Sequence, residues 1–382
     1  MDPLRPYNDL PPLPPRTDVE TRAILKQCVG ARTALAELRL AGQLIPDPAV
    51  LIQTIPNLEA RASSEIENIV TTNDALFREA SLGDSEATAA TKEAARNRTA
   101  LYLGAETLKT RPLTTRLAVE VCRAIKGIDL DIRRTPGTSL RNSHTGEVIY
   151  TPPEGEAHLR ELLANWERFL NEPRDIDPLV RMAIQHYQFE AIHPFPDGNG
   201  RTGRILNILS LIQDGLLDLP TLYLSRYILS TRGDYYRLLG RVTSHQEWEP
   251  WILYMLTAVE VTSTWTTQKV RAIRALMEET NTYVRNSAPK TYSRDLADLI
   301  FVRPYSRIAN LVEQGIAQRH TASFYLKELV QIGVLEEEKV GRDKIFLHRK
   351  YLDVLFSDGH TFEPYPRATG VEAAKRRARA RS

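Results

Sequence analysis

One short segment, residues 193–204, concentrates most of the chemistry that this sequence offers. It reads His-Pro-Phe-Pro-Asp-Gly-Asn-Gly-Arg-Thr-Gly-Arg, and an apolar run with helical spacing follows it at once. A glycine-rich turn that opens a helix presents free backbone N–H groups and the positive end of the helix dipole, and both suit a phosphate group. The segment therefore indicates a phosphate-binding loop at a helix N-terminus.

The ionisable residues of this loop fit the same chemistry. Arg201 and Arg204 carry fixed charges whose fork geometry matches phosphate oxygens. Asp197 is a candidate ligand for Mg²⁺, which binds phosphorylated ligands through few carboxylates and several waters. His193 can accept a proton near neutral pH. Together these residues predict nucleotide-phosphate chemistry with an activated hydroxyl.

The loop resembles, residue for residue, the signature of the Fic family (filamentation induced by cAMP). That signature is His-Pro-Phe-x-Asp/Glu-Gly-Asn-Gly/Lys-Arg-Thr/Ser-x-Arg, and no position of residues 193–204 departs from it. Most characterised Fic proteins transfer AMP from ATP to a protein hydroxyl, so the resemblance implies a protein adenylyltransferase. The implied target is a Ser, Thr or Tyr hydroxyl, and pyrophosphate is the leaving group.

The resemblance also gives each residue of the loop an expected role. His193 is the expected general base, and Asp197 is expected to hold a Mg²⁺ that bridges the α- and β-phosphates. Asn199 is expected to donate its side-chain amide to the α-phosphate. Arg201 and Arg204 are expected to contact the β- and γ-phosphates. The other expected nucleotide-binding residues, which let the backbone approach the phosphates or line the pocket, are Gly198, Gly200, Thr202, Gly203, Ser225 and Arg226.

A second motif lies far upstream, at residues 63–68, which read Ser-Ser-Glu-Ile-Glu-Asn. It resembles the inhibitory motif of the family, Ser/Thr-x-x-x-Glu-Gly/Asn, with Ser63, Glu67 and Asn68 in register. Ser63 and Glu67 are four residues apart and so share one face of a helix. The resemblance implies that Glu67 pairs with Arg204 and occupies the arginine that the γ-phosphate needs. A further hypothesis is that Glu67 positions a water for removal of AMP from modified protein.

The apolar spacing along the chain predicts a mostly helical fold. Helical periodicity is found over residues 19–44, 59–69, 86–107, 114–125, 158–170, 179–191, 202–211 and 248–266. The resemblance divides these segments into an N-terminal helical region, residues 1–107, which carries the inhibitory motif, and a Fic catalytic domain, residues 108–268.

A β-hairpin interrupts the helical pattern inside the predicted catalytic domain. Residues 133–153 are rich in Thr, Val, Ile and Tyr around a Thr145-Gly146 turn, which favours a hairpin with residues 147–150 as its second strand. The part from about 140 to 151 resembles the flap of Fic proteins. The flap is expected to pair with an extended segment of a target protein through backbone hydrogen bonds, which would place the target hydroxyl by His193.

The pattern changes again from about residue 289. A short helix, a turn at Gly315, a second helix over 321–332 and a glycine-containing hairpin follow one another, which is the order of a winged helix. We place this winged-helix domain at residues 289–352. The remaining segment, residues 353–382, ends in a run of basic residues and is predicted to be disordered.

Three alternatives remain open at this stage. The winged helix could bind DNA, which would make the protein a DNA-binding regulator with a vestigial Fic domain. Its second helix is only modestly basic, with Arg319, His320 and Lys327. A Fic enzyme could also use another donor, although Gly200 in place of Lys favours AMP transfer. A metal hydrolase built on His186, Glu190 and His193 is the third, but this spacing is not His-Glu-x-x-His.

Bulk properties place few further limits on the function. The net charge of the 382 residues is +2, so charge alone points to no nucleic acid or membrane partner. Cys28 and Cys122 cannot form a disulfide framework and fit a reducing cytoplasm. The Pro-rich start lacks the apolar segment of a signal peptide, and no apolar stretch approaches the roughly 20 residues of a membrane span. We therefore expect a cytoplasmic protein, and relatives suggest a homodimer.

Overall fold

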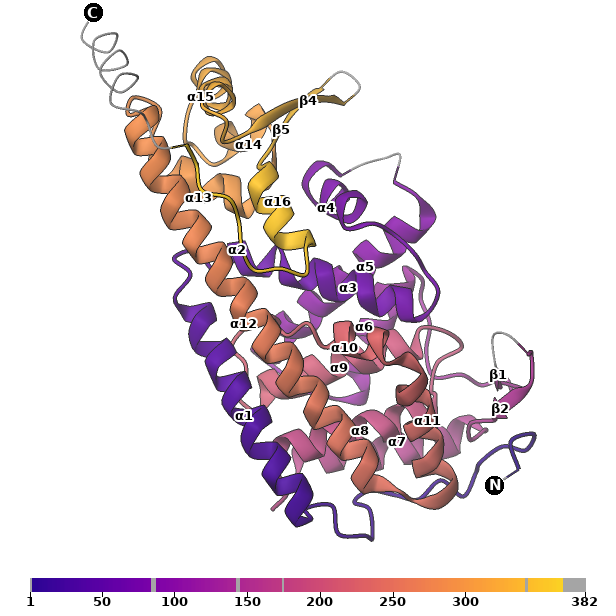
Figure 1. Ribbon diagram of the computed structural model, residues 1–382. Helices are drawn as coiled ribbons and strands as arrows, with labels where there is room; N and C mark the ends of the chain where they lie inside the picture. The colour runs from indigo at the N-terminus through magenta and orange to yellow at the C-terminus, as the bar shows by residue number, and fades with distance from the viewer. Residues whose placement is uncertain (1, 84–86, 142–144, 174, 341–342, 367–382) are drawn as a thin grey trace, which may run out of the picture. The chain divides into compact units, whose positions relative to one another are not determined.

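The computed structural model describes residues 2–83, 87–141, 145–173, 175–340 and 343–366. Helices dominate these residues, and strands are confined to two small antiparallel sheets (Figure 1). The mostly helical fold class predicted from the sequence is therefore confirmed. The chain divides into two compact units. The first comprises residues 1–40, 55–76 and 86–266, and the second comprises residues 41–54, 77–85 and 267–382.

The first unit is built from helices around a central pair. The helices that lie wholly in it are α3 (Ile55–Ile66), α5 (Ala89–Leu108), α6 (Thr115–Lys126), α7 (Glu156–Asn171), α8 (Pro178–Ile192), α9 (Asn199–Gln213), α10 (Leu224–Ser230) and α11 (Arg232–His245). Three further helices, α1 (Arg22–Gln43), α4 (Asn73–Leu82) and α12 (Trp248–Ser287), have residues in both units.

The central pair is α8 and α9, which pack against each other. Nearly every residue of both helices is buried, and their buried side chains include polar and charged ones as well as apolar ones. Helix α7 covers α8, while α5, α6 and α3 pack on α9. Gly104 of α5 allows a close approach to α9, because a Cβ atom there would lie 2.5 Å from Leu209 Cδ1. The segment that joins α8 to α9 is the signature loop, so the most buried helices of the unit position it.

Specific cap residues set the ends of these helices. The side chains of Thr114 and Asp177 accept hydrogen bonds from the first turns of α6 and α8, and Pro178 fits the first position of α8. Helix α6 ends at Gly127, whose φ of 66° is left-handed. The predicted helices mostly agree with the observed ones to within a few residues.

Helix α12 is much longer than the segment 248–266 predicted from the sequence. Thr262 and Thr266 donate their hydroxyl groups to the carbonyl groups of Ala258 and Thr262, four residues earlier. This satisfies the hydroxyls without leaving the helix, so the apolar face continues to Ser287.

The predicted hairpin is present in the first unit but is shorter than predicted. Strand β1 (Leu140–Arg141) pairs antiparallel with β2 (Val148–Tyr150), with Leu140 opposite Tyr150 and a bulge beside it. The hairpin lies at the edge of the helical unit (Figure 1). Residues 142–144, which belong to the predicted flap, lie outside the described residues.

The second unit combines short helices with a three-stranded antiparallel sheet of order β3-β5-β4. Its elements are α2 (Ala49–Ile52), α13 (Arg294–Val302), β3 (Tyr305–Ser306), α14 (Ile308–Glu313), α15 (Arg319–Gln331), β4 (Glu336–Val340), β5 (Asp343–Leu347) and α16 (Arg349–Phe356). The helix, turn, helix and hairpin expected from the sequence are therefore present, and α13 and β3 precede them.

The structure corrects the predicted start of the disordered tail at residue 353. Helix α16 continues to Phe356 because its apolar residues are buried, and Lys269 donates to the carbonyl oxygens of Ser357 and Gly359 at 2.9 and 2.6 Å. Tyr365 is buried and stacks on Tyr283, with ring centroids 4.6 Å apart. The basic residues 367–382 lie outside the described part of the chain.

None of the helices in the described residues is long and apolar enough to cross a membrane.

Candidate active site

His193 occupies a constrained position at the end of α8. Its φ of 49° is left-handed, and its N–H group donates to the Phe189 carbonyl at 3.0 Å to close the helix. Arg133 fixes the same turn, because its Nε donates to the His193 carbonyl at 2.8 Å and its backbone N–H donates to the Pro194 carbonyl at 2.9 Å. Burial, together with the charge of Arg133, lowers the pKa of His193 to about 4. The imidazole is therefore neutral at physiological pH and can accept a proton.

Asn199 locks the turn between His193 and α9. Its Oδ1 accepts from the Phe195 N–H, and its Nδ2 donates to the Phe195 carbonyl, both at 2.8 Å. Phe195 itself is buried and packs near Phe189. One side-chain N–H of Asn199 is used by the Phe195 carbonyl. A phosphate would have to accept from the second N–H of the same amide group. Donation to an α-phosphate stays a prediction.

The first turn of α9 has the geometry that suits an anion, and phosphate binding there stays a prediction. The Thr202 N–H donates to the Gly198 carbonyl at 3.0 Å, so the N–H groups of residues 199–201 have no partner within the helix. Gly198 has a φ of 85°, which a residue with a side chain would adopt only under strain. The positive end of the α9 helix dipole also lies at this N-terminus.

The structure brings the inhibitory motif and the signature loop together at Arg204. Arg204 Nη2 lies 2.8 Å from Glu67 Oε1 and also donates to the Ser63 carbonyl at 2.8 Å, while Nε donates to Ser63 Oγ at 2.9 Å. The Arg204 side chain is 1% exposed and that of Glu67 is 34% exposed. Burial lowers the pKa of Arg204, but the neighbouring groups Glu67, Tyr235, Tyr236 and Glu190 together outweigh this effect and raise the pKa. A Cβ atom on Gly200 would collide with Glu67 Oε1, so a side chain at this position would push the Glu67 carboxylate aside.

Asn68 has a conformational role in this motif. Its φ of 62° is left-handed, and its N–H donates to the Glu65 carbonyl at 3.0 Å just after the end of α3. Glycine and asparagine are the residues that adopt this conformation at helix ends, which accounts for the Gly/Asn position of the motif. The Oδ1 atom also accepts from Arg232 Nη1 at 3.0 Å.

Glu190 and His186 lie buried next to Arg204. Burial raises the pKa of Glu190 to about 7 and lowers that of His186 to about 3. His186 Nε2 lies 2.8 Å from the Tyr235 hydroxyl, and a Cβ atom on Gly203 would collide with Glu190 Oε1. Within the described ranges, no group of three or more His, Cys, Asp or Glu side chains could hold a metal ion.

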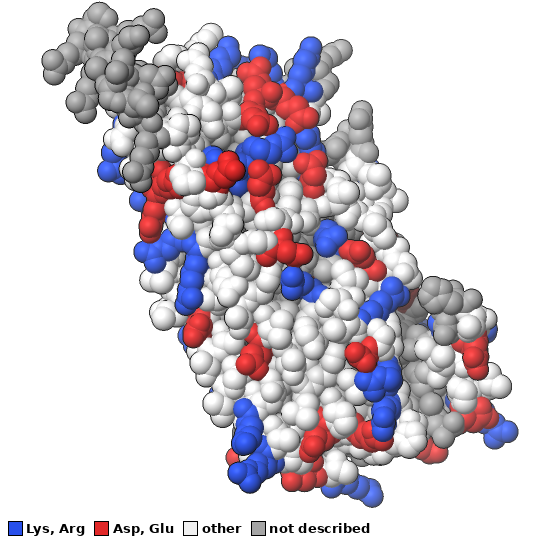
Figure 2. All heavy atoms as spheres, in the orientation of Figure 1, with Lys and Arg blue, Asp and Glu red and all other residues white. Residues whose placement is uncertain are grey.

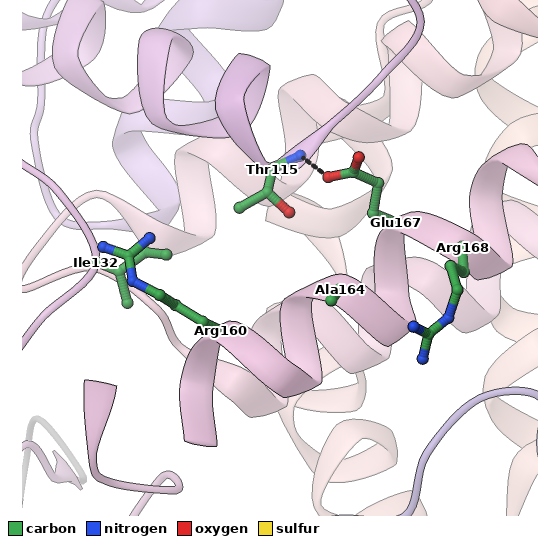
Figure 3. Close-up of a pocket in the computed structure, with 6 residues that line it drawn as sticks. All are labelled: Thr115, Ile132, Arg160, Ala164, Glu167 and Arg168. Carbon is green, nitrogen blue, oxygen red and sulfur yellow. Dashed lines mark hydrogen bonds between the residues drawn. The ribbon is translucent and has the colours of Figure 1, made fainter. Parts of the chain in front are cut away.

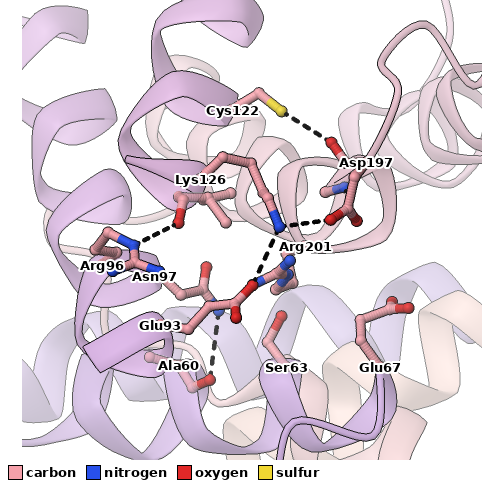
Figure 4. A network of polar contacts seen from close by, with 12 residues as sticks. Ala60, Ser63, Glu67, Glu93, Arg96, Asn97, Cys122, Lys126, Asp197 and Arg201 are labelled. Atoms are coloured by element: carbon pink, nitrogen blue, oxygen red, sulfur yellow. Dashed lines mark hydrogen bonds and ion pairs between the residues drawn. The ribbon is translucent and has the colours of Figure 1, made fainter. Parts of the chain in front are cut away.

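Asp197 and Arg201 are joined by two residues that the sequence analysis did not identify. Asp197 Oδ2 lies 2.5 Å from Lys126 Nζ, and Arg201 Nη1 lies 2.7 Å from Glu93 Oε1 (Figure 4). Burial raises the pKa of the Asp197 carboxyl, but the hydrogen bond and charge of Lys126 outweigh this and lower it. The Asp197 side chain is 64% exposed, whereas that of Arg201 is only 2% exposed. No local motif marks Glu93 or Lys126, because their partners are far away in the sequence.

Ser225 and Arg226 make structural contacts in this state. The Ser225 N–H donates to Glu59 Oε2 at 2.8 Å and its hydroxyl donates to Glu59 Oε1, which fastens the start of α10 to α3. Burial raises the pKa of Glu59 to about 7. The Arg226 guanidinium lies 4.7 Å from the centre of the Trp265 ring. That these two residues line a nucleotide pocket stays a prediction.

The hairpin is anchored close to His193. The Tyr150 hydroxyl of β2 donates to the Ala191 carbonyl at 2.8 Å, two residues before His193. Ile149 on the same strand is 50% exposed. Strand β2 is therefore held next to the end of α8.

A surface pocket of about 350 Å³ lies at the start of α6, beside α7 (Figure 3). It is lined by Thr115, Ile132, Arg160, Ala164, Glu167 and Arg168. Glu167 Oε2 accepts from the Thr115 N–H at 2.8 Å and so satisfies the helix N-terminus. Because none of the signature residues lines this pocket, it is not the candidate active site.

Comparisons with known proteins agree with this geometry. Three family models match successive parts of the chain: Fic/DOC family N-terminal at residues 25–106, Fic/DOC family at residues 116–211, and Protein adenylyltransferase SoFic-like, C-terminal domain, at residues 276–351. The chain belongs to the Fic/DOC family.

Named relatives match shorter stretches. A probable protein adenylyltransferase of Aquifex aeolicus is 41% identical over 81 residues, which is 21% of this chain and 24% of the relative. Protein adenylyltransferase fic-1 of Caenorhabditis elegans is 35% identical over 108 residues, which is 28% of this chain and 20% of the relative. The chain thus covers about a quarter or less of the length of these relatives.

Solved structures share the fold. A Fic family protein from Desulfovibrio desulfuricans G20 has a TM-score of 0.54 and 23% sequence identity, and the similarity covers 87% of this chain and 98% of that chain.

Proposed function

We propose that this protein is an autoinhibited protein adenylyltransferase, which transfers AMP from ATP to a Ser, Thr or Tyr hydroxyl of a target protein. The observation that carries the proposal is the placement of a neutral His193 beside the open first turn of α9. The family match over residues 116–211 and the names of the relatives support it.

The transfer step follows from this arrangement. The target hydroxyl oxygen forms a bond to the α-phosphorus of ATP while the bond to the pyrophosphate oxygen breaks, and the hydroxyl proton passes to His193. The N–H groups of the first turn of α9, with the second amide N–H of Asn199, balance the charge on the α-phosphate. Pyrophosphate leaves against Arg201 and Arg204.

Mg²⁺ fits this loop at Asp197. The exposed carboxylate supplies one protein ligand, which is the usual protein share of a Mg²⁺ site that also uses phosphate oxygens and waters. A Mg²⁺ bound there would neutralise charge between the α- and β-phosphates.

Glu67 acts as the inhibitor in this proposal. Arg204 is buried and directs both its Nε and its Nη2 at Ser63 and Glu67. An arginine engaged in this way cannot offer the same donors to a γ-phosphate, so ATP binds weakly or in an unproductive position. Loss of the Glu67 carboxylate frees Arg204 for the nucleotide.

The hairpin is the proposed docking site for the target protein. Tyr150 holds β2 near His193, and an extended target segment that pairs with the hairpin by backbone hydrogen bonds would bring its hydroxyl to the imidazole.

Removal of AMP from modified protein is a secondary hypothesis. The Glu67 carboxylate lies against Gly200 and is 34% exposed, so it can hold a water at the α-phosphate site. If the hypothesis is correct, release of AMP from modified protein is slower with Glu67→Gly than with the wild type. Equal release rates would contradict it.

The charges of the second unit do not favour the DNA-binding alternative. All residues of β4 are exposed, and Glu336, Glu337 and Glu338 are three of the five. Figure 2 shows acidic side chains gathered in this region, and basic and acidic groups intermixed elsewhere on the same face. Glu336 and Glu337 pair with Arg349 and Lys344, so the described residues of this hairpin offer DNA phosphates a surface of mixed charge rather than a basic one. We therefore keep adenylyl transfer as the proposed function; cytoplasmic location and homodimerisation stay predictions.

The test of the proposed function uses ATP labelled at different phosphates. The Glu67→Gly protein is incubated with cell lysate, Mg²⁺ and either α-³²P-ATP or γ-³²P-ATP, with Glu67→Gly/His193→Ala as the control. Adenylyl transfer labels protein with α-³²P-ATP only, and only when His193 is present. Label from γ-³²P-ATP that appears with Glu67→Gly but not with the His193→Ala control would indicate phosphoryl transfer by this protein and contradict the proposal.

A further inference from the structure

A chain of four alternating charges connects two residues of the signature loop, Asp197 and Arg201, through two neighbouring helices. Lys126 Nζ lies 2.5 Å from Asp197 Oδ2 and 3.3 Å from Glu93 Oε1, and Arg201 Nη1 lies 2.7 Å from the same Oε1 atom. Figure 4 shows the Lys126 ammonium between the carboxylates of Asp197 and Glu93. Glu93 belongs to α5 and Lys126 is the last residue of α6. Neither residue is part of the signature.

The Lys126 side chain lies against the loop itself. A Cβ atom on Gly198 would be 3.4 Å from Lys126 Cδ, so the lysine stem packs on the turn that opens α9. The Lys126 side chain is 19% exposed, which places the ammonium at the rim of the loop. An ammonium group has three N–H donors, and the two carboxylates use two of them.

The shared oxygen of Glu93 makes Lys126 and Arg201 neighbours. Both cations contact Glu93 Oε1, so the Lys126 ammonium and the Arg201 guanidinium lie close to each other at one carboxylate. On the other side, Lys126 contacts Asp197, the carboxylate that is expected to face the phosphates across a metal ion. Lys126 therefore lies between Asp197 and Arg201, the two loop residues that are expected to act on the β-phosphate.

We propose that Lys126 is a nucleotide-binding residue outside the signature, which donates to the β-phosphate of ATP. Glu93 is the positioning residue that keeps Lys126 beside Arg201. In the bound state, Lys126 exchanges its contact with Asp197 for a contact with the β-phosphate and keeps its contact with Glu93. This inference rests on the proposed function, because it assumes that the loop binds a nucleoside triphosphate.

The test compares ATP and AMP binding by calorimetry in the Glu67→Gly protein, in the presence of Mg²⁺. Lys126→Gln removes the charge and Lys126→Arg retains it. Lys109→Gln removes an exposed lysine that pairs with Glu106 on the surface. A charge-assisted hydrogen bond is worth about 10-fold or more in affinity, so Lys126→Gln should raise the Kd for ATP by that factor. AMP has no β-phosphate, so its Kd should not change. Lys126→Arg and Lys109→Gln should bind ATP nearly as tightly as the parent.

Two results would overturn this inference. One is an unchanged Kd for ATP with Lys126→Gln, and the other is an equal loss of ATP and AMP affinity, which would mean that Lys126 only holds the loop in shape. A thermal unfolding scan of each variant identifies the second case, because a purely structural role lowers the melting temperature together with both affinities. If the Glu67→Gly parent itself does not bind ATP, the proposed function is overturned as well. The titration of this parent with ATP distinguishes that case from a loss of affinity caused by Lys126→Gln.

The Glu93→Gln variant tests the positioning role separately. The amide keeps the size of the side chain but removes the charge that holds Lys126 and Arg201 together. We expect weaker ATP binding with little effect on AMP, the same pattern as Lys126→Gln. The double variant should then lose little more than either single variant, because the two residues act on the same phosphate contact. Additive losses would contradict a shared role.

Discussion

Arg204 of the signature loop and Glu67 of the inhibitory motif form an ion pair at 2.8 Å, although 137 residues separate them in the sequence. Ser63 contributes two more hydrogen bonds to the same guanidinium. Helix α3 and Glu67, which directly follows it, therefore present a preformed set of acceptors to Arg204, the arginine that we assign to the γ-phosphate. This relationship connects the fold of the first unit to its proposed regulation.

The conformation of Asn68 should determine how well Glu67 is placed. Asn68→Gly keeps the left-handed backbone, because glycine adopts a φ of 62° without strain, and its activity should stay close to that of the wild type. Asn68→Val cannot adopt this conformation easily, since a β-branched residue at positive φ is strained by about 1–3 kcal/mol. We expect a lower melting temperature and higher basal transfer for Asn68→Val. Equal basal transfer by the two variants would show that the helix end does not control Glu67.

Ser63→Ala should release the inhibition only in part. The substitution removes the hydroxyl that accepts from Arg204 Nε, but the Ser63 carbonyl and Glu67 continue to hold Nη2. One hydrogen bond to a charged group contributes about 1.5–3 kcal/mol, and we expect transfer activity to rise between the wild-type level and that of Glu67→Gly. The measurement is the initial rate of label transfer at a fixed ATP concentration. Activity at or below the wild-type level would exclude Ser63 from the inhibitory contact.

The pH dependence of transfer should reflect the low pKa of His193. Burial and Arg133 lower this pKa to about 4, so the imidazole stays neutral and able to accept a proton well below its ordinary value. In the Glu67→Gly protein, kcat/KM should therefore show no loss attributable to His193 between about pH 8 and pH 5, and should fall as the pH approaches 4. An acid limb with a midpoint near the ordinary histidine value of about 6.5 would contradict the buried, neutral imidazole.

Much of the fold could be predicted because its helices carry regular apolar spacing and conventional caps. The loop between α8 and α9 could be identified because its chemistry lies in twelve consecutive residues. The length of α12 could not be predicted. The side-chain hydroxyls of Thr262 and Thr266 form hydrogen bonds with helix carbonyl groups, and composition does not indicate this. The structured part of the predicted tail depends on α16 and Tyr365 finding buried partners distant in sequence.

The missed residues of the site share one physical property. Glu93 and Arg201 are 108 residues apart, and Lys126 and Asp197 are 71 residues apart. Ion pairs across such separations leave no local pattern. Arg133 is a similar case, because it supports His193 through backbone carbonyls and needs no particular neighbour in the sequence. Ser225 is predicted from the sequence to line the nucleotide pocket, and in the structure its backbone N–H donates a hydrogen bond to the Glu59 carboxylate.

The most direct test of the central claim compares label transfer from α-³²P-ATP by the wild type, Glu67→Gly and Glu65→Gln. Glu65 is a matched control, because it lies in the same motif but pairs with Arg61 instead of Arg204. If the Glu67 carboxylate withholds Arg204 from ATP, Glu67→Gly transfers label about 10- to 100-fold faster than the wild type, the worth of one charged hydrogen bond, and Glu65→Gln does not. Equal rates for Glu67→Gly and the wild type, with both proteins folded and binding ATP, would contradict the account.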